Sequence, residues 1–487
     1  MGGPHVVVLV GDCLRATNAT ADTLPFCSKL SSVEFTRCYS PGTWTRPSHA
    51  SLYTGETAVE HGVTRRGDVL DGSQAVLPSR ARANGYQTAL FSENPTFSTK
   101  TGFHHGIDYV DDAVHLKPFR STFSPDAHVD EMSPAAASAL LREIARRPDR
   151  TRNLANLAYT FASRVTETDP TACPHHGDRV FAHLRSFVRE NGDEPLFCIA
   201  NLLDTHNPHH APPTVGSEAL GLSVPADERR ALAAVDDDRE YLFGEATLPP
   251  ETRAWFDSWD EVFERREQVY DAQIRYLDSL IERWYGAIGR VLDESLVVVT
   301  GDHGQLFGEE GELGHQTSLH PHGVHVPLLV DPPASWDGSR GVETPVTWVG
   351  LSNALGGVVD GTVSDTEAFV DAVVDGSRTD GRVVVCADGP TYDLTTLRER
   401  YGDEAVATVS VRRVGFVERD AMTVYESGWD ESTVRRRRYA LRDGSRELQS
   451  ETPDATPEEP YAGWLRGGGT GGGDVETSER LRQLGYL

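Results

Sequence analysis

Five short apolar runs stand out along the chain, and each leads into a polar loop. They are His5–Val10, Gly85–Phe91, Pro195–Leu202, Ser295–Thr300 and His325–Val330. Runs without polar alternation are typical of strands that are buried on both faces of a parallel sheet. Segments with helical spacing lie between them, at Ser79–Asn84, Asp178–Glu190 and Glu261–Ile288. Because strands and helices alternate, we expect an α/β fold with a doubly wound, mostly parallel sheet.

The pattern changes toward the C-terminus. Arg382–Cys386 is another apolar run, and three later segments alternate as antiparallel strands do: Ala405–Val414, Phe416–Val424 and Arg438–Arg442. We therefore expect a catalytic domain over residues 1–375 and a smaller α+β subdomain over residues 376–487. A glycine-rich linker, Gly467–Gly473, precedes a predicted terminal helix, Ser478–Leu487.

Two long segments interrupt the alternation, and both match no chemical motif. His104–Ala172 is predicted to form an insertion over the sheet. The acidic segment Pro212–Glu251 is interpreted as a solvated excursion, with a lid as the alternative. We expect these segments to select the organic part of any substrate.

Polar side chains follow the predicted strands. Asp12, Asn94, His206 and the pair Asp302-His303 each stand just after an apolar run, and His315 lies a little further on. The carboxyl ends of parallel strands share one edge of a sheet, so these residues are expected to meet there. Carboxylates and imidazoles together suit Mg²⁺, Ca²⁺ or Mn²⁺, and they also bind Zn²⁺.

The segment Thr43–Gly55 adds a hydroxyl to this set. Thr45 stands at a predicted helix start, where Pro47 fits the first turn and Thr45 or Ser48 is expected to cap the exposed amides. By itself this is an ordinary capped helix. Next to a metal, however, the hydroxyl of Thr45 would become more acidic.

Composition narrows the function classes. The chain of 487 residues has a net charge of −28, and its only lysines are Lys29, Lys100 and Lys117. Such acidity with little lysine is typical of halophilic proteins, and it disfavours non-specific binding of nucleic acid. An anionic substrate would need a local positive site such as a metal.

Cysteine usage and the N-terminal pattern bear on location. The six cysteines show no paired metal-binding spacing, and Cys198 and Cys386 lie in apolar runs, so we expect buried free thiols. The first strand begins at His5, which leaves no room for a signal peptide, and no apolar run is long enough to span a membrane. We therefore expect a soluble, cytoplasmic protein; its oligomeric state stays open.

These motifs resemble the sulfatase branch of the alkaline phosphatase superfamily. The resemblance rests on Asp12 after the first strand, on Thr45–Gly55, on Asp302-His303-Gly304 and on Gly314-His315-Gln316, with further similarity at Tyr270–Asp278, His325–Leu328 and Leu481–Leu487. It implies a metal-dependent hydrolase of sulfate or phosphate esters.

The resemblance also implies residue roles. Asp12, Thr45, Asp302 and His303 would hold one divalent cation, with Thr45 as the nucleophile. His206 and His315 would contact the ester oxygens or the leaving group. His49, Asn94 and Arg46 would face the substrate, which is expected to be a small-molecule or glycan anionic ester. Asp204, His206, His209, His210 and His315 offer enough ligands for a second ion, but we favour one ion and expect His209 and His210 to face solvent.

Departures from the family pattern leave the ester open. The nucleophile position holds Thr45 instead of the cysteine or serine that sulfatases oxidise to formylglycine, and His49 replaces an arginine. Cys13 replaces a second metal-binding aspartate, and Glu93-Asn94-Pro95 replaces a sulfate-binding lysine and histidine. We expect phosphate mono- or diesters to be cleaved at least as readily as sulfate esters. The alternatives are a phosphoglycerol-transferase-like or phosphodiesterase activity on a glycan or lipid head group, and a non-catalytic relative that binds anions.

Overall fold

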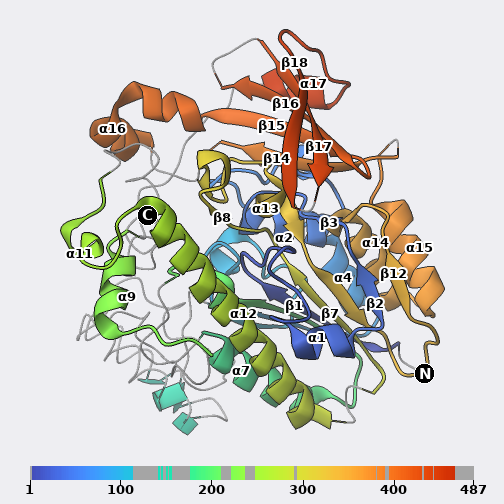
Figure 1. Ribbon diagram of the computed structural model, residues 1–487. Coiled ribbons are helices and arrows are strands. Elements are labelled where there is room, and N and C mark those ends of the chain that lie inside the picture. The colour runs from blue at the N-terminus through green and yellow to red at the C-terminus, as the bar shows by residue number, and fades with distance from the viewer. Residues whose placement is uncertain are drawn as a thin grey trace.

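A large sheet organises the protein, as the computed structural model shows (Figure 1). The structure describes residues 3–112, 141–142, 144–145, 150–151, 153–155, 176–209, 221–235, 247–289, 293–379, 381–389, 394–429, 433–442 and 444–466. The predicted terminal helix, the linker before it, most of His104–Ala172 and half of Pro212–Glu251 lie outside these residues.

The large sheet has eight strands in the order β12-β2-β11-β7-β1-β6-β4-β5. In that order the strands are Arg340–Val342, Val33–Phe35, Leu328–Asp331, Ser295–Gly301, His5–Gly11, Leu196–Leu202, Gln87–Ser92 and Tyr109–Asp112. All neighbours pair in parallel except β11, which runs antiparallel to both β7 and β2. The predicted mostly parallel sheet is confirmed.

Helices cover both faces of this sheet, as expected for a doubly wound fold. Val7 and Leu9 of β1 pack into one apolar core, and Val6, Val8 and Val10 pack into the other. This follows from the two-residue period of a strand. The first core includes residues of α1 (Pro25–Leu30), α7 (His176–Asn191) and α12 (Trp259–Ile288); the second includes residues of α2 (Thr45–Thr54), α4 (Val76–Ala83), α14 (Trp348–Val359) and α15 (Thr366–Gly376).

A second, antiparallel sheet lies at the C-terminal end, at the top of Figure 1. Its strands are β14 (Val383–Asp388), β15 (Val411–Val417), β16 (Ala421–Gly428), β17 (Arg435–Arg442) and β18 (Ser445–Thr452). The predicted strand at Ala405–Val414 is wrong in its first half, because α16 covers Leu394–Val409. Leu397, Ala405, Val406 and Val409 are buried there with helical spacing, and this face packing outweighs the apparent alternation.

The C-terminal sheet touches the segment before α2. The amide of Cys386 donates to the carbonyl oxygen of Pro41 at 2.9 Å, and Gly42 forms an isolated bridge with Cys386. The backbone leading to Thr45 is therefore held by a strand from the other end of the chain.

Short elements complete the described chain. The helices are α3 (Ala58–His61), α9 (Ala226–Ala233), α11 (Pro250–Arg253), α13 (Pro321–Val324) and α17 (Tyr461–Arg466). A small sheet joins β10 (His325–Val326), β3 (Cys38–Tyr39) and β13 (Val346–Thr347), and β8 (Leu306–Phe307) pairs with β9 (Leu313–Gly314). Within the described residues we find no helix that combines the length and apolarity needed to cross a bilayer.

Candidate active site

The predicted polar residues meet at one edge of the large sheet. β1 lies between β6 and β7, so the residues that follow these strands, Asp12, His206 and Asp302, are brought together. Asn94 follows β4 in the same way. Thr45 arrives from α2, of which it is the first residue.

Thr45 sits among these side chains at hydrogen-bond or near hydrogen-bond distances. Its Oγ1 lies 3.3 Å from Oδ2 of Asp12 and 3.4 Å from Nε2 of His303, and it accepts a hydrogen bond of 2.9 Å from Nδ2 of Asn94. Nε2 of His303 is also 3.5 Å from Oδ2 of Asp302. The cluster is buried, since Thr45 is 4% exposed and the carboxylates and His303 are 0% exposed.

The start of α2 corrects one expectation. Neither Thr45 nor Ser48 caps this helix; Trp44 is the N-cap residue and makes no side-chain capping bond. The Thr45 hydroxyl is instead directed to Asn94 and Asp12, while Ser48 Oγ donates to the carbonyl oxygen of Trp44 at 3.0 Å.

Neighbouring groups fix the orientation of the Asn94 amide and of the His303 imidazole. Oδ1 of Asn94 accepts from the backbone amide of Thr96 at 2.8 Å and from its hydroxyl at 2.6 Å, which leaves Nδ2 facing Asp12 and Thr45. Nδ1 of His303 lies 2.9 Å from the carbonyl oxygen of Gly304. A carbonyl at Nδ1 holds the proton there, so Nε2 presents its lone pair to the cluster.

The two carboxylates differ in their electrostatics. Burial raises the pKa of Asp302 well above its ordinary value, and the charge of Asp12 raises it further. Burial also opposes ionisation of Asp12, but His206, His303 and the amides of Asn94 and Asn201 outweigh it, so the pKa of Asp12 is lowered. Without a cation, the pair thus favours only one negative charge.

Two imidazoles at the cluster, those of His303 and His315, have lowered pKa values that favour their neutral form. Burial lowers the pKa of His303 to about 4, and burial together with the neighbouring histidines lowers the pKa of His315 well below its ordinary value. His206 lies with Nε2 4.0 Å from Oδ1 of Asp12, and its ring centre is 5.6 Å from that of His315. Neutral imidazoles are the form that binds metals.

His49 and Arg46 are placed differently from the rest. The ring of His49 is fully buried, with its centre 3.8 Å from that of Phe97, and Nδ1 lies 2.8 Å from the carbonyl oxygen of Thr45 and 3.9 Å from Oδ2 of Asp302. Burial lowers its pKa to about 4. The Arg46 guanidinium donates to the backbone carbonyl oxygens of residues 65, 66 and 68. His49 therefore borders the cluster on its buried side, next to Asp302, whereas Arg46 is directed to backbone carbonyl oxygens outside the cluster. The expected contacts of both residues with the substrate stay a prediction.

His209 does not face solvent as expected. It is 1% exposed, and its Nδ1 lies 3.1 Å from Oε1 of Gln273 on α12. The apolar and aromatic surroundings of Tyr270 and Phe307, with ring centres 5.5 and 5.1 Å away, account for this burial. His210 lies outside the described residues.

Sequence reasoning left two contributors to the cluster without a role. Asn201 Nδ2 donates to Oδ2 of Asp12 at 3.2 Å, and Cys13 Sγ lies 3.6 Å from Oδ1 of Asp12. Asn201 is the polar member of the apolar strand β6, and Cys13 directly follows Asp12. A polar residue inside an apolar strand, and a thiol next to a candidate metal ligand, were the sequence signals that could have identified Asn201 and Cys13.

The donor set fits a divalent cation. Within the described residues, three overlapping groups have their ligand atoms within 4.8 Å of one another: Asp12, Asp302 and His303; Asp12, Cys13 and His206; Cys13, His303 and His315. Oδ2 of Asp302 is buried and receives no hydrogen bond within the described chain. A buried carboxylate oxygen without a donor is costly unless a cation faces it.

Comparison with solved structures shows that other proteins share this fold. The chain is similar to a phosphonate monoester hydrolase from Silicibacter pomeroyi, with 18% identity, coverage of 90% of this chain and 89% of that chain, and a TM-score of 0.57. It is also similar to a protein solved in complex with its substrate D-glucosamine-2-N,6-O-disulfate, with 13% identity, coverage of 99% of this chain and 96% of that chain, and a TM-score of 0.52. At these identities the likeness concerns the fold alone.

A family model named Sulfatase matches residues 4–357, so the chain belongs to the sulfatase family and is a hydrolase acting on ester bonds. A curated relative, N-acetylglucosamine-6-O-sulfatase from Bacteroides thetaiotaomicron, is 32% identical over 73 residues. That match spans 15% of this chain and only 13% of the relative.

Proposed function

We propose that this protein hydrolyses sulfate and phosphate esters, phosphonate monoesters included, through the Thr45 hydroxyl at a divalent cation. Asp12, Thr45, Asp302 and His303 would hold the cation, and Ca²⁺, Mg²⁺, Mn²⁺ and Zn²⁺ all suit these donors. The observation that carries the proposal is the position of Thr45 Oγ1, which lies 3.3 Å from Asp12, 3.4 Å from His303 and 2.9 Å from Asn94.

The hydrogen bonds around Thr45 orient its hydroxyl for attack. Asn94 Nδ2 donates to Oγ1, so the hydroxyl proton is directed to Oδ2 of Asp12. Asp12 keeps a lowered pKa and is therefore ionised at neutral pH, as an acceptor of that proton must be. When bound, the cation supplies positive charge that favours the alkoxide and neutralises the anionic ester.

The reaction then needs two displacements. Thr45 Oγ1 forms a bond to sulfur or phosphorus while the bond to the ester oxygen breaks, and the alcohol leaves with a proton. Water then hydrolyses the Thr45 ester and restores the hydroxyl. Nδ1 of His206 lies 2.7 Å from the carbonyl oxygen of Asn207, and Nδ1 of His315 lies 2.8 Å from Oε1 of Gln305, so the contacts with ester oxygens or leaving group fall to Nε2 of each ring.

The choice of ester follows from the nucleophile. A threonine has a secondary hydroxyl and lacks the route to formylglycine, so the enzyme works through the unmodified side chain. The similarity of the fold to a phosphonate monoester hydrolase supports phosphoryl substrates, and the similarity to a protein that binds a sulfated glucosamine supports a sugar as the organic part.

A panel of p-nitrophenyl sulfate, phosphate, phosphodiester and phosphonate tests the proposal with Thr45→Val, which keeps the shape and removes the hydroxyl. The charge of −28 argues for assays in high salt. We expect a loss of at least about 10⁴-fold in kcat, because removing a nucleophile disables the whole catalytic unit. Ser48→Ala, which deletes another buried hydroxyl of α2, is the matched control and should stay close to wild type. Full activity in Thr45→Val would remove Thr45 from the mechanism, and turnover of the sulfate alone would refute the hydrolysis of phosphoryl esters.

A further inference from the structure

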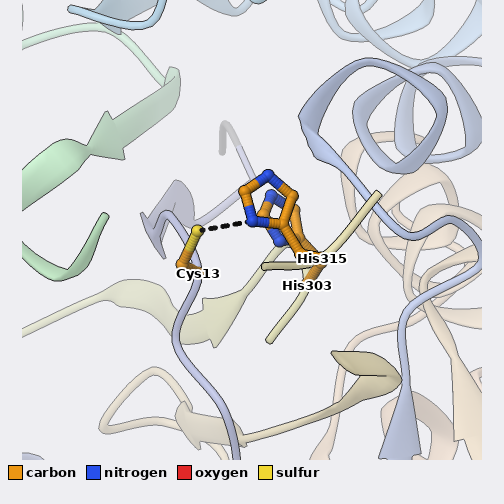
Figure 2. Close-up of side chains that lie close together, drawn as sticks. All are labelled: Cys13, His303 and His315. Carbon is orange, nitrogen blue, oxygen red and sulfur yellow. Dashed lines mark hydrogen bonds between the residues drawn. The ribbon is translucent and has the colours of Figure 1, made fainter. Parts of the chain in front are cut away.

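The hairpin formed by β8 and β9 leads directly to His315, one of the two imidazoles expected to contact the ester. Figure 2 shows the ring of His315 beside that of His303, and the two ring centres are 4.4 Å apart. The base of the hairpin is closed by its own side chains. Nδ1 of His315, directly after β9, lies 2.8 Å from Oε1 of Gln305, directly before β8. The position of the imidazole therefore depends on the shape of the hairpin.

Three glutamates crowd the tip of this hairpin. They are Glu309, Glu310 and Glu312. The backbone at Glu310 has a φ of +55°, in the left-handed region that residues other than glycine rarely adopt. Such strain, together with the repulsion between like charges, is kept where surrounding contacts oppose it. The conformation of the tip thus requires partners from outside the hairpin.

Two arginines from distant parts of the chain neutralise the tip. Nη1 of Arg15, which follows β1, lies 2.6 Å from Oε1 of Glu309. Arg446 of β18 donates to Oε2 of Glu310 from Nε at 3.1 Å and from Nη2 at 2.7 Å. The same Nη2 lies 3.6 Å from Oε1 of Glu312. Burial opposes the ionisation of Glu310, but the hydrogen bond and the charge of Arg446 outweigh it, so the pKa of Glu310 is lowered.

The hairpin of β17 and β18 holds Arg446 in place. The side chain of Arg446 is only 9% exposed, and its guanidinium carbon lies 4.8 Å from the ring centre of Tyr439 on β17. The turn between the two strands fits closely against α13, because a Cβ atom added to Gly444 would lie 2.8 Å from Nε2 of His322. Arg446 is therefore a largely buried, fixed charge, and its attraction to the glutamates is screened less by salt than that of an exposed arginine.

We propose that Arg446 is a positioning residue for ester hydrolysis, because it holds the glutamate-rich tip of the β8–β9 hairpin and thereby keeps the His315 imidazole at the ester. The inference rests on the proposed function through the role of His315. Glu312 lies three residues before His315, so a displaced tip shifts the imidazole. A misplacement of about 1 Å at a catalytic group lowers a rate by up to about 100-fold.

A double-mutant cycle in the full-length protein tests this coupling. Steady-state kinetics on the best p-nitrophenyl ester compare the wild type, Arg446→Ala, His315→Ala and the double variant. We expect His315→Ala to lower kcat by at least about 100-fold. Arg446→Ala should lower kcat by about 10- to 100-fold and leave KM within about threefold, because the contact of His315 strengthens in the transition state. In the His315→Ala background the further loss should be below about twofold, since both substitutions remove the same contact.

Two variants serve as controls. Arg438 lies on β17 of the same hairpin and pairs with Glu418 at 2.8 Å, so Arg438→Ala removes an exposed ion pair and should stay within about twofold of wild type. Arg446→Lys keeps the charge without the planar fork and should recover about threefold or more of the loss. If Arg446→Ala fails to fold, Glu310→Gln, which keeps the shape and removes the partner charge, takes its place in the cycle with the same expectation.

Two results would overturn the inference. One is a kcat of Arg446→Ala within about twofold of wild type, and the other is a loss that persists in full in the His315→Ala background. Both leave the proposed nucleophile standing, because Thr45→Val tests it separately. Full turnover by Thr45→Val would overturn that nucleophile, and the cycle on the remaining activity would still decide the role of Arg446.

Hydrogen exchange decides the inference if no ester is turned over, a result that would refute the proposed function. The amides of Gly308 and Glu312 are hydrogen-bonded within the β8–β9 hairpin. They should exchange at least about tenfold faster in Arg446→Ala than in the wild type, because local opening becomes easier. Arg438→Ala should leave their exchange unchanged. Equal exchange in Arg446→Ala and the wild type would overturn the positioning role.

Discussion

Replacing Asn94 with alanine removes an amide that donates both to the Asp12 carboxylate, at 2.6 Å, and to the Thr45 hydroxyl, at 2.9 Å. The side chain is 0% exposed, and Thr96 holds its other end, so water cannot readily take its place. We expect the variant to fold and to lose the alignment of the Thr45 hydroxyl with Asp12.

The size of the effect follows from the two hydrogen bonds. A bond to a charged acceptor contributes about 1.5–3 kcal/mol, and a bond to a neutral hydroxyl about 0.5–1.5 kcal/mol. Together they amount to about 2–4.5 kcal/mol, which corresponds to a fall in kcat/KM of about 30- to 2,000-fold. Most of the loss should appear in kcat, because Asn94 contacts Thr45 and Asp12, the proposed nucleophile and its proposed proton acceptor.

Steady-state kinetics on the best p-nitrophenyl ester, with Thr96→Val as the matched control, measure this prediction. Thr96→Val removes the hydroxyl that donates to Oδ1 of Asn94 but keeps the amide that donates to the same oxygen, so a loss of less than about tenfold is expected. An Asn94→Ala variant within about threefold of wild type would show that the amide does not position Thr45.

Two predictions concern stability. Asp388 is buried and pairs with Arg65 at 3.0 Å and with Arg412 at 3.1 Å. Asp388→Ala should therefore lower the free energy of unfolding, measured in urea titrations, by about 3–5 kcal/mol. A loss below about 1 kcal/mol would contradict a buried ion-pair network. Burial lowers the pKa of His61 to about 4. Below pH 6.5 the unfolded chain therefore binds more protons at this residue than the folded chain does. The contribution of His61 to the free energy of unfolding is complete above pH 6.5 and falls by up to about 3 kcal/mol as the pH drops to 4. Urea midpoints at pH 7 and pH 4.5 should differ less in His61→Gln, and an unchanged difference would exclude His61 as a source of acid sensitivity.

The main strands could be predicted because their runs are long, apolar and rich in valine. Five predicted runs correspond to β1, β4, β6, β7 and the pair β10–β11, and the rule that ligands gather at the carboxyl ends of parallel strands brought Asp12, Asn94 and Asp302 together correctly. The positions of these three residues could be predicted because each lies only one or two residues beyond the end of its strand in the sequence.

Contacts that depend on distant packing could not be predicted. Arg46 donates to the carbonyl oxygens of a loop, and no local sequence pattern reveals such partners. The expected contact of Arg46 with the substrate stays a prediction. His209 follows polar residues in sequence but is covered by aromatic rings from α12 and β8. The sulfur of Cys13 reaches the cluster through a left-handed backbone angle, which the sequence does not encode visibly for a cysteine.

The pairing of the C-terminal sheet with the N-terminal part of the chain matters for synthesis on the ribosome. Thr64 and Asp388, joined by a hydrogen bond of 2.8 Å, are 324 residues apart, and Cys386 holds the backbone that leads to Thr45. At about 5–20 residues per second, roughly 15–65 s separate the synthesis of the two segments. During that interval Thr45 and Asp12 have emerged, but the strand that fixes the approach to α2 does not yet exist. The backbone that leads to Thr45 therefore acquires its final support late in translation, only after Cys386 has been made.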